Sequence, residues 1–242
     1  MDSFPVWSPD GRTIVFSSSR GVKQLANLYW VAADGSSEAH RLTTSDLRQL
    51  ATSWHPSGNY LAFEQQISTQ QWDLMVVPMD VSGSGWKAGT PTRVMSNIAQ
   101  RPTAVFSPDG RWLAYASNES GRSEVFVRSF PGAGTQWQVS TSGGWLPTWS
   151  RHRNELFYLS PDSRLMVVSY TIEGDTFRAN PPQKWSEQPI NERPTSRWFD
   201  LHPDGDRIVA SGDLATRTNV DKVVLVSSFF DVVRRQSSDS RR

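Results

Sequence analysis

Trp7-Ser8-Pro9-Asp10-Gly11 precedes the apolar run Thr13-Ile14-Val15-Phe16, and this arrangement recurs along the chain. Pro presets φ near −65° for the first central position of a tight turn, and Gly accepts the left-handed conformation that closes a bulged hairpin. Neighbouring turns lie 47, 52, 43 and 52 residues apart, a period typical of propellers with four-stranded blades. The later copies are Trp54-His55-Pro56-Ser57-Gly58, Phe106-Ser107-Pro108-Asp109-Gly110, Trp149-Ser150-Arg151-His152-Arg153 and Leu201-His202-Pro203-Asp204-Gly205.

Strand-forming runs follow each turn, and no window has a sustained helical period. Second strands are predicted at 13–16, 60–63, 112–115, 155–158 and 207–210, third strands at 27–31, 73–77, 124–127, 164–168 and 222–226, and outer strands at 40–43, 92–95 and 137–140. The sequence therefore predicts an all-β propeller of about five four-stranded blade-like repeats, or an incomplete part of a larger propeller. The repeats fill residues 1–233, as units near 1–48, 49–100, 101–143, 144–195 and 196–233.

Three local departures from the repeat are expected. In the fourth turn Arg153 stands where the other copies have Gly, so this turn should be the most irregular. The Pro-rich stretch from Pro181 to Pro194 is interpreted as a long surface loop. Residues 234–242 are basic and Ser-rich, and we expect a disordered tail there.

Composition excludes several classes of function. The 242 residues carry a net charge of +1, so the chain has no strong positive potential that would attract nucleic acid or an anionic membrane. The chain has no cysteine, so disulfides, thiolate zinc sites and cysteine nucleophiles are excluded. No apolar run reaches the roughly 18 residues of a membrane span, and residues 1–7 lack a signal-peptide pattern. We expect neither nucleic-acid binding nor membrane insertion.

The first repeat resembles the TolB-type, WD-like propeller repeat of bacteria, through 5–12, 27–29 and 34–43. The stretches 143–162 and 199–205 are similar to propeller regions C-terminal to bacterial serine/threonine kinase domains. The resemblance implies a sensor or interaction module and suggests a periplasmic or extracytoplasmic location. It does not imply kinase activity, because the chain has no glycine-rich phosphate loop, His-Arg-Asp loop or Asp-Phe-Gly motif.

Catalytic, metal and cofactor sites are not expected. The turn Asp residues recur once per blade, so they should lie apart around the ring instead of forming an acid–base pair. His55 and His202 stand where other copies have Ser, a position that caps the turn, and no metal-ligand spacing accompanies the histidines. No Gly-x-Ser-x-Gly elbow occurs. We therefore predict a non-enzyme without metal or cofactor.

The tryptophans divide into two groups. Trp7, Trp54 and Trp149 share one phase of the repeat with Phe106, so they are predicted to pack between blades. Four others lie off that phase and remain candidates for ligand stacking: Trp86, Trp145, Trp185 and Trp198.

Ligand binding is predicted on the face opposite the Pro-Asp-Gly turns, where loops enter the innermost strands and join second to third strands. The candidate residues there are Arg20, Lys23, Arg48, Arg101, Glu119, Arg122, Trp145 and Arg197. The leading hypothesis is a non-catalytic module that binds a protein or peptide partner, as the C-terminal sensor or interaction part of a longer bacterial protein. The alternatives are a propeller that gates a prolyl-oligopeptidase-type hydrolase, and a propeller that binds carbohydrate or another small molecule.

Closure of the ring is the last expectation. An open blade edge leaves unpaired backbone groups, so propellers commonly fasten the first blade to the last. The chain begins almost on the first innermost strand, and its last apolar run is 229–233. The sequence therefore predicts a part of a longer protein, with an exposed apolar edge through which copies self-associate.

Overall fold

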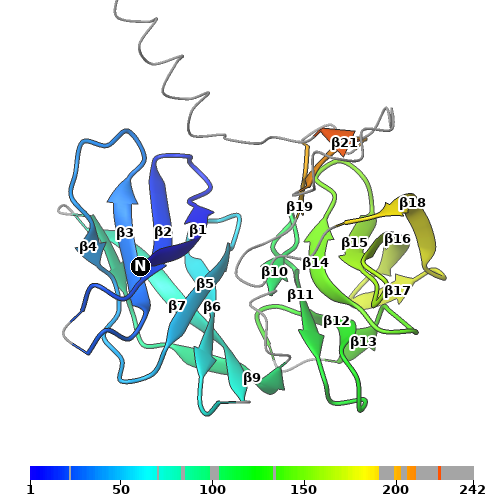
Figure 1. Cartoon of the computed structure of the whole chain (residues 1–242), viewed down its shortest axis with the longest axis horizontal. Helices are drawn as coiled ribbons and strands as arrows, with labels where there is room; N and C mark the ends of the chain where they lie inside the picture. The colour runs from blue at the N-terminus through cyan, green and yellow to red at the C-terminus, as the bar shows by residue number, and fades with distance from the viewer. Residues whose placement is uncertain are drawn as a thin grey trace, which may run out of the picture.

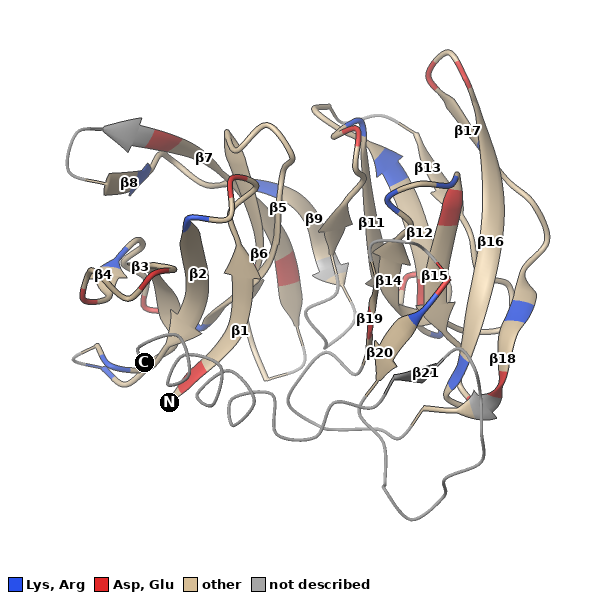
Figure 2. Ribbon diagram, turned by 90° about the horizontal axis from the view of Figure 1, so that it is seen from above, with Lys and Arg blue, Asp and Glu red and all other residues tan. Residues whose placement is uncertain are grey.

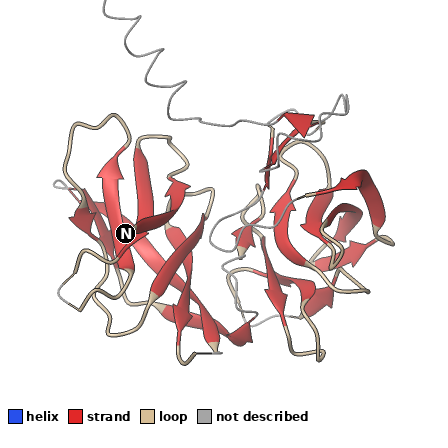
Figure 3. Cartoon of the chain, viewed as in Figure 1, coloured by secondary structure: helices blue, strands red, loops and turns tan. Residues whose placement is uncertain are grey.

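Strands make up the regular structure of this protein, and Figure 3 shows them joined by loops with no helix in the described part. The computed structural model describes residues 1–21, 23–69, 71–82, 85–98, 104–132, 135–190, 199–202, 206–210 and 223–224. The all-β prediction is confirmed over these residues. The predicted basic tail at 234–242 lies outside them.

Blades 1 and 3 are regular four-stranded antiparallel units whose strands follow chain order. Blade 1 consists of β1 (Asp2–Trp7), β2 (Thr13–Ser18), β3 (Asn27–Ala32) and β4 (His40–Arg41). Blade 3 consists of β10 (Val105–Phe106), β11 (Trp112–Ser117), β12 (Glu124–Ser129) and β13 (Gln136–Gln138). Second, third and outer strands thus form where the sequence predicts them.

Blades 2 and 4 carry an extra hairpin, because their third strands continue past the blade and turn back. Blade 2 consists of β5 (Gln49–Trp54), β6 (Tyr60–Gln66), β7 (Trp72–Ser82) and β9 (Thr92–Ile98), with β8 (Gly85–Ala88) as the return of the hairpin. Blade 4 consists of β14 (Trp145–Trp149), β15 (Glu155–Leu159), β16 (Arg164–Glu173) and β18 (Gln183–Pro189), with β17 (Thr176–Ala179) as the return.

Strand β18 corrects one prediction. The Pro-rich stretch is not a continuous loop, since β18 pairs with β16 as the outer strand of blade 4. Residues 184–186 alternate polar and apolar, as a strand with one buried face does. Trp185 packs edge-on against Phe157 with 6.1 Å between ring centroids, while its neighbours Lys184 and Ser186 are polar. Proline is tolerated on such an edge strand because one side makes no ladder hydrogen bonds.

The fifth repeat is only partly formed in the described residues. It contributes β19 (Phe199–Leu201), β20 (Ile208–Ala210) and β21 (Val223–Val224). Strand β21 runs parallel to β20, whereas a third blade strand reached through a hairpin would be antiparallel. Over the described residues the propeller prediction is therefore confirmed, with four complete blades and part of a fifth repeat. In Figure 1, β1 to β7 lie in the left half and β11 to β19 in the right half.

Four apolar clusters form the core, and each lies mainly between neighbouring units. Trp54 packs with Val15 of blade 1, Phe106 packs with Leu50 of blade 2, and Trp149 packs with Val105 of blade 3. These three aromatic residues are core residues, as predicted. Trp7 is not, because 58% of it is exposed and no described residue of a preceding blade covers it.

The first three repeated turns are built as their sequence predicts, while Pro203 to Gly205 of the fifth lie outside the described residues. Gly11, Gly58 and Gly110 have φ of 69°, 79° and 73°, and each glycine N–H donates to the carbonyl three residues before it. In the second turn the His55 Nδ1 accepts the Ser57 N–H at 3.1 Å, so His55 caps this turn. The fourth turn differs, because Arg153 does not adopt a positive φ and its N–H donates to the Ser150 hydroxyl at 3.2 Å.

Candidate binding rim

The loops opposite the Pro-Asp-Gly turns form one rim of the propeller, which we call the loop rim. Its described segments include 19–21, 23–26, 42–48, 67–69, 118–123, 139–144 and 160–163. Antiparallel pairing places them at the end of the blades away from the turns, because each turn joins first and second strands. Figure 2 shows basic and acidic residues interspersed over the blades.

Arg20 on the loop rim is held within blade 1. Its guanidinium contacts the Asp2 carboxylate at 2.7 Å and lies 5.2 Å and 5.3 Å from the ring centroids of Phe16 and Tyr29. The Ser18 hydroxyl donates to Asp2, and this bond, with the charge of Arg20, lowers the pKa of the Asp2 carboxyl below its usual value. Arg20 therefore covers an aromatic pair and fixes the first strand.

Lys23 lies beside a small cavity between the β2–β3 loop and the loop after β4. Its ammonium pairs with Asp46 at 2.7 Å. The cavity has a volume of about 160 Å³, and its lining includes Asn27 and Arg41. Asn27 is buried and accepts a hydrogen bond from Arg41 at 2.7 Å. Small-molecule sites usually enclose about 300–1,000 Å³, so this cavity suits a water or a single short side chain.

Arg48 is the exposed cation of the loop between blades 1 and 2. Its backbone carbonyl accepts the Gln66 N–H at 2.9 Å, which fixes the segment at the start of β5. No carboxylate among the described residues forms an ion pair with its guanidinium. Arg48 is thus the candidate cation whose charge is least engaged within the described part of the chain.

Arg122 belongs to a buried network. Its Nε donates to Glu124 at 2.5 Å, and Glu124 is fully buried at the start of β12. The Gly143 N–H donates to the same carboxylate at 3.0 Å, and the Ser140 hydroxyl donates to its other oxygen. A buried carboxylate is tolerated when such donors surround it. Arg122 therefore joins two loops of blade 3 and is a structural residue.

Glu124 was missed as a rim residue, because the sequence places it in a predicted strand. The signal that could have found it is the arginine two residues before an acidic residue that opens an otherwise apolar strand. Glu119, in the same loop as Arg122, is exposed, and its carboxylate accepts a hydrogen bond from Gln136 at 2.9 Å. It remains accessible to a partner.

The tryptophans off the repeat phase pack inside the fold where they are described. Trp86 lies 4.7 Å from Trp54 between ring centroids, and Trp185 contacts Phe157. Trp145 is partly buried against the cluster between blade 4 and the fifth repeat. Trp198 lies outside the described residues. The three described rings thus serve packing.

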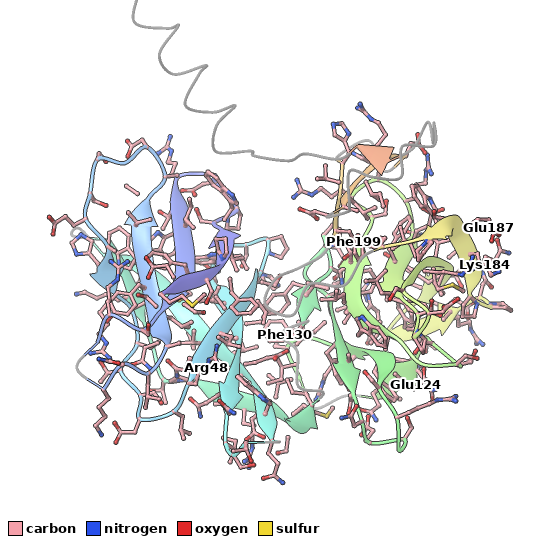
Figure 4. All side chains as sticks on the ribbon, in the orientation of Figure 1. Arg48, Glu124, Phe130, Lys184, Glu187 and Phe199 are labelled. Carbon is pink, nitrogen blue, oxygen red and sulfur yellow. The ribbon has the colours of Figure 1, made fainter. Side chains whose placement is uncertain are left out.

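The candidate residues do not converge on one pocket. Arg20 and Lys23 share one loop of blade 1, and Glu119 and Arg122 share one loop of blade 3. Figure 4 shows Arg48 and Glu124 in different halves of the molecule. Arg101 and Arg197 lie outside the described residues. The loop rim is therefore an extended surface, on which Arg48 and Glu119 are the described charged candidates that form no ion pair with another described residue.

Two searches of the described ranges gave negative results. No group of three or more His, Asp or Glu side chains there is arranged to hold a metal ion. No helix there is long and apolar enough to cross a membrane.

Comparison with known proteins gives the fold a name. No family model matches the chain. Over 144 residues the chain is 27% identical to the "Uncharacterized peptidase YuxL" of Bacillus subtilis. The aligned residues make up 47% of this chain and 21% of that protein.

Two solved structures are similar. The structural alignment with the TolB protein of Acinetobacter baumannii covers 86% of this chain and 48% of that protein, with a TM-score of 0.60 and 18% identity. The alignment with a TolB-type protein of Agrobacterium tumefaciens covers 72% of this chain and 62% of that protein, with a TM-score of 0.55 and 21% identity. The chain thus spans less than two thirds of the length of each of these proteins. Together with the four antiparallel blades, these similarities show that the chain has a TolB-like β-propeller fold.

Proposed function

We propose that this chain is a non-catalytic binding module that engages a protein or peptide through the loop rim. The proposal rests on which charged residues of the loop rim are ion-paired within the described part of the chain. Arg20, Lys23 and Arg122 are ion-paired within the fold, whereas Arg48 is exposed and has no carboxylate partner among the described residues. A partner carboxylate would complete the pairing of Arg48, and Glu119 provides an accessible acceptor on the same rim.

The module would act as the sensor or interaction part of a longer bacterial protein. Support comes from the extended form of the rim, because a protein or peptide can span loops of several blades while the 160 Å³ cavity is too small for most ligands. A kinase-linked or envelope context remains part of this proposal.

Selection of peptides from a displayed random library on the immobilised chain tests the proposal. Affinities of the selected peptides would be measured by fluorescence anisotropy. We expect Arg48→Ala to weaken binding about twofold to fivefold, because a surface-exposed charge pair contributes up to roughly 1 kcal/mol. Arg151→Ala is the matched control, since Arg151 is exposed on the turn rim. Equal affinity for wild type and Arg48→Ala, or equal loss in both variants, would contradict the assignment to the loop rim.

A second candidate is the propeller part of a larger hydrolase, and the similarity to YuxL favours it. In either case we expect no turnover by this chain alone. Purified protein would be assayed with peptidase, esterase, glycosidase and ATPase substrates. Turnover that persists through repurification and disappears with one point substitution would refute the non-catalytic assignment. A hydrolase domain encoded in the same polypeptide would favour the second candidate over the first.

A further inference from the structure

Two arginines, Arg41 and Arg93, occupy equivalent positions in the outer strands of blades 1 and 2. Arg41 pairs with Tyr29 across β3 and β4, and Arg93 pairs with Met75 across β7 and β9. Tyr29 and Met75 are themselves equivalent, because each pairs with the phenylalanine of its second strand. The surroundings of the two arginines can therefore be compared directly.

The acceptor that each arginine reaches differs between the blades. Arg93 lies 3.4 Å from the carboxylate of Asp73, which is buried in β7. Arg41 donates instead to the Asn27 amide oxygen at 2.7 Å and to the Thr43 carbonyl at 3.0 Å. Neither of these acceptors is charged, and no carboxylate among the described residues forms an ion pair with Arg41. Because a guanidinium has five N–H donors, Arg41 keeps donors for a further acceptor.

Arg41 lines the cavity of about 160 Å³ between the β2–β3 loop and the loop after β4. Gly21 lines it as well, and a Cβ at Gly21 would stand 3.0 Å from the Arg41 Nη2, so the missing side chain leaves space beside the guanidinium. The charged groups of the lining are Arg41, Lys23 and Asp46, of which Lys23 and Asp46 pair with each other at 2.7 Å and are largely exposed. The cavity thus has a surplus positive charge and room for one short side chain.

We propose that this cavity binds a carboxylate of the peptide or protein partner, supplied by an acidic side chain or by a chain terminus, with Arg41 as its main ligand and Lys23 beside it. This inference rests on the proposed function and names the chemical group that blade 1 recognises. The bound carboxylate gives Arg41 the countercharge that Asp73 gives Arg93. A guanidinium and a carboxylate match as a planar, bidentate pair. The buried Asn27 holds the guanidinium in place before binding, which lowers the cost of ordering it.

Titration with acetyl-aspartate amide, followed by NMR of the isotope-labelled chain, tests the cavity without a selected peptide. The Arg41 Nε–H resonance should shift and saturate, whereas acetyl-asparagine amide, the neutral isostere, should leave it unchanged. Acetyl-alanine, which has a free terminal carboxylate, distinguishes the two sources, because the tighter of the two carboxylates identifies the group that the cavity accepts better. No shift with either carboxylate, or the same shift with the neutral isostere, overturns the proposal.

Arg41→Gln should weaken binding of the better carboxylate about fivefold or more, because it removes the charge and the bidentate donor pair. The outer strand tolerates this change, since Gln138 has the equivalent position in blade 3 and donates to the Ser140 carbonyl at 2.8 Å. Arg93→Gln is the matched control and should leave binding unchanged, because Asp73 already pairs with Arg93. Thermal unfolding verifies that both variants are folded. Equal losses in the two variants, or no loss in Arg41→Gln, would contradict the assignment.

The peptides selected on the immobilised chain separate this inference from the proposed function. Replacing the acidic residues of a selected peptide by their amides, and blocking its terminal carboxylate, should weaken its binding to wild type but not to Arg41→Gln. Peptides that bind the loop rim with equal affinity in both forms would refute the carboxylate site and leave the binding module. Saturable binding of acetyl-aspartate amide to a chain that selects no peptide would support the anion cavity and refute the peptide-binding module.

Discussion

The indole Nε1–H of Trp86 donates a hydrogen bond to the Thr13 hydroxyl at 3.0 Å, although 73 residues separate them. Trp86 lies on the hairpin that extends from the third strand of blade 2, and Thr13 begins the second strand of blade 1. The hairpin thus reaches across the interface of the two blades. The indole ring of Trp86 also packs edge-on against that of Trp54, with 4.7 Å between the ring centroids.

Blade 4 repeats this device against blade 3. Phe177 on β17 is 1% exposed and lies 6.0 Å from Trp149 and 5.5 Å from Trp112 between ring centroids. Arg111 of blade 3 donates to the Gly174 carbonyl at the hairpin tip at 2.7 Å. Blades 1 and 2, and blades 3 and 4, are therefore joined as pairs by their hairpins.

Removing the Trp86 side chain should loosen the first pair. We expect Trp86→Ala to lower the free energy of unfolding by about 2–3 kcal/mol, less than for a fully buried tryptophan, because this ring is only partly buried. Trp86→Phe should lower it by about 1 kcal/mol, because the hydrogen bond to Thr13 is lost. Urea unfolding followed by circular dichroism measures both.

Trp7→Ala is the control for Trp86→Ala, since Trp7 is a largely exposed tryptophan of blade 1. It should change stability by less than about 0.5 kcal/mol, because most of its ring is exposed. Equal losses for the two alanine variants would show that the hairpin does not stabilise the blade pair.

Gly110 tests the contact between blades 2 and 3. A Cβ at this position would collide with the His55 imidazole, whose Nε2 lies 3.0 Å from the Gly110 carbonyl oxygen. Gly11 is the matched position, with nearly the same φ and no atom within 4 Å of an added Cβ. Both Gly→Ala changes introduce backbone strain of about 1 kcal/mol or more.

We expect Gly110→Ala to lower stability by about 1–3 kcal/mol more than Gly11→Ala, because only the former overpacks an interface between blades. Chemical denaturation of the two variants provides the comparison. The interpretation would be wrong if the two losses agreed within about 0.5 kcal/mol.

Buried tyrosines should make the fold sensitive to alkali. Burial raises the pKa of Tyr158 and of Tyr170 to about 12, with smaller contributions from the Glu124 and Asp109 charges respectively. In the unfolded chain a tyrosine titrates near pH 10. Between about pH 10 and 12 the folded chain therefore binds more protons than the unfolded chain, and stability falls as pH rises. Below pH 10 this contribution is fully present.

The urea midpoint should accordingly decrease from about pH 9.5 to about pH 11.5. Tyr158→Phe should make the decrease shallower, because one raised pKa is removed. A midpoint that does not change over this range, or the same slope in Tyr158→Phe, would contradict the assignment of the tyrosine pKa values.

The sequence by itself determined the local structure of the blades. Pro and Gly in the turn 8–11 act through local φ preferences, so the hairpin can be read without its surroundings. The alternating strands that follow fix which side chains face a neighbouring blade. For this reason the second strands of all five repeats and the core positions of Trp54, Phe106 and Trp149 could be predicted.

Only the tertiary structure decided what each position meets. Trp7 and Trp54 occupy the same position of the repeat, yet Trp7 is 58% exposed and Trp54 is buried against blade 1. Glu124 reads as the first residue of a strand, but folding buries its carboxylate and brings to it the Ser140 hydroxyl and the Gly143 N–H from the loop after β13. Burial and the donors to a buried charge depend on segments far apart in the sequence, whereas turn chemistry lies within a few residues. The repeat therefore predicted the blades, and packing between them selected which candidate residues remain available to a partner.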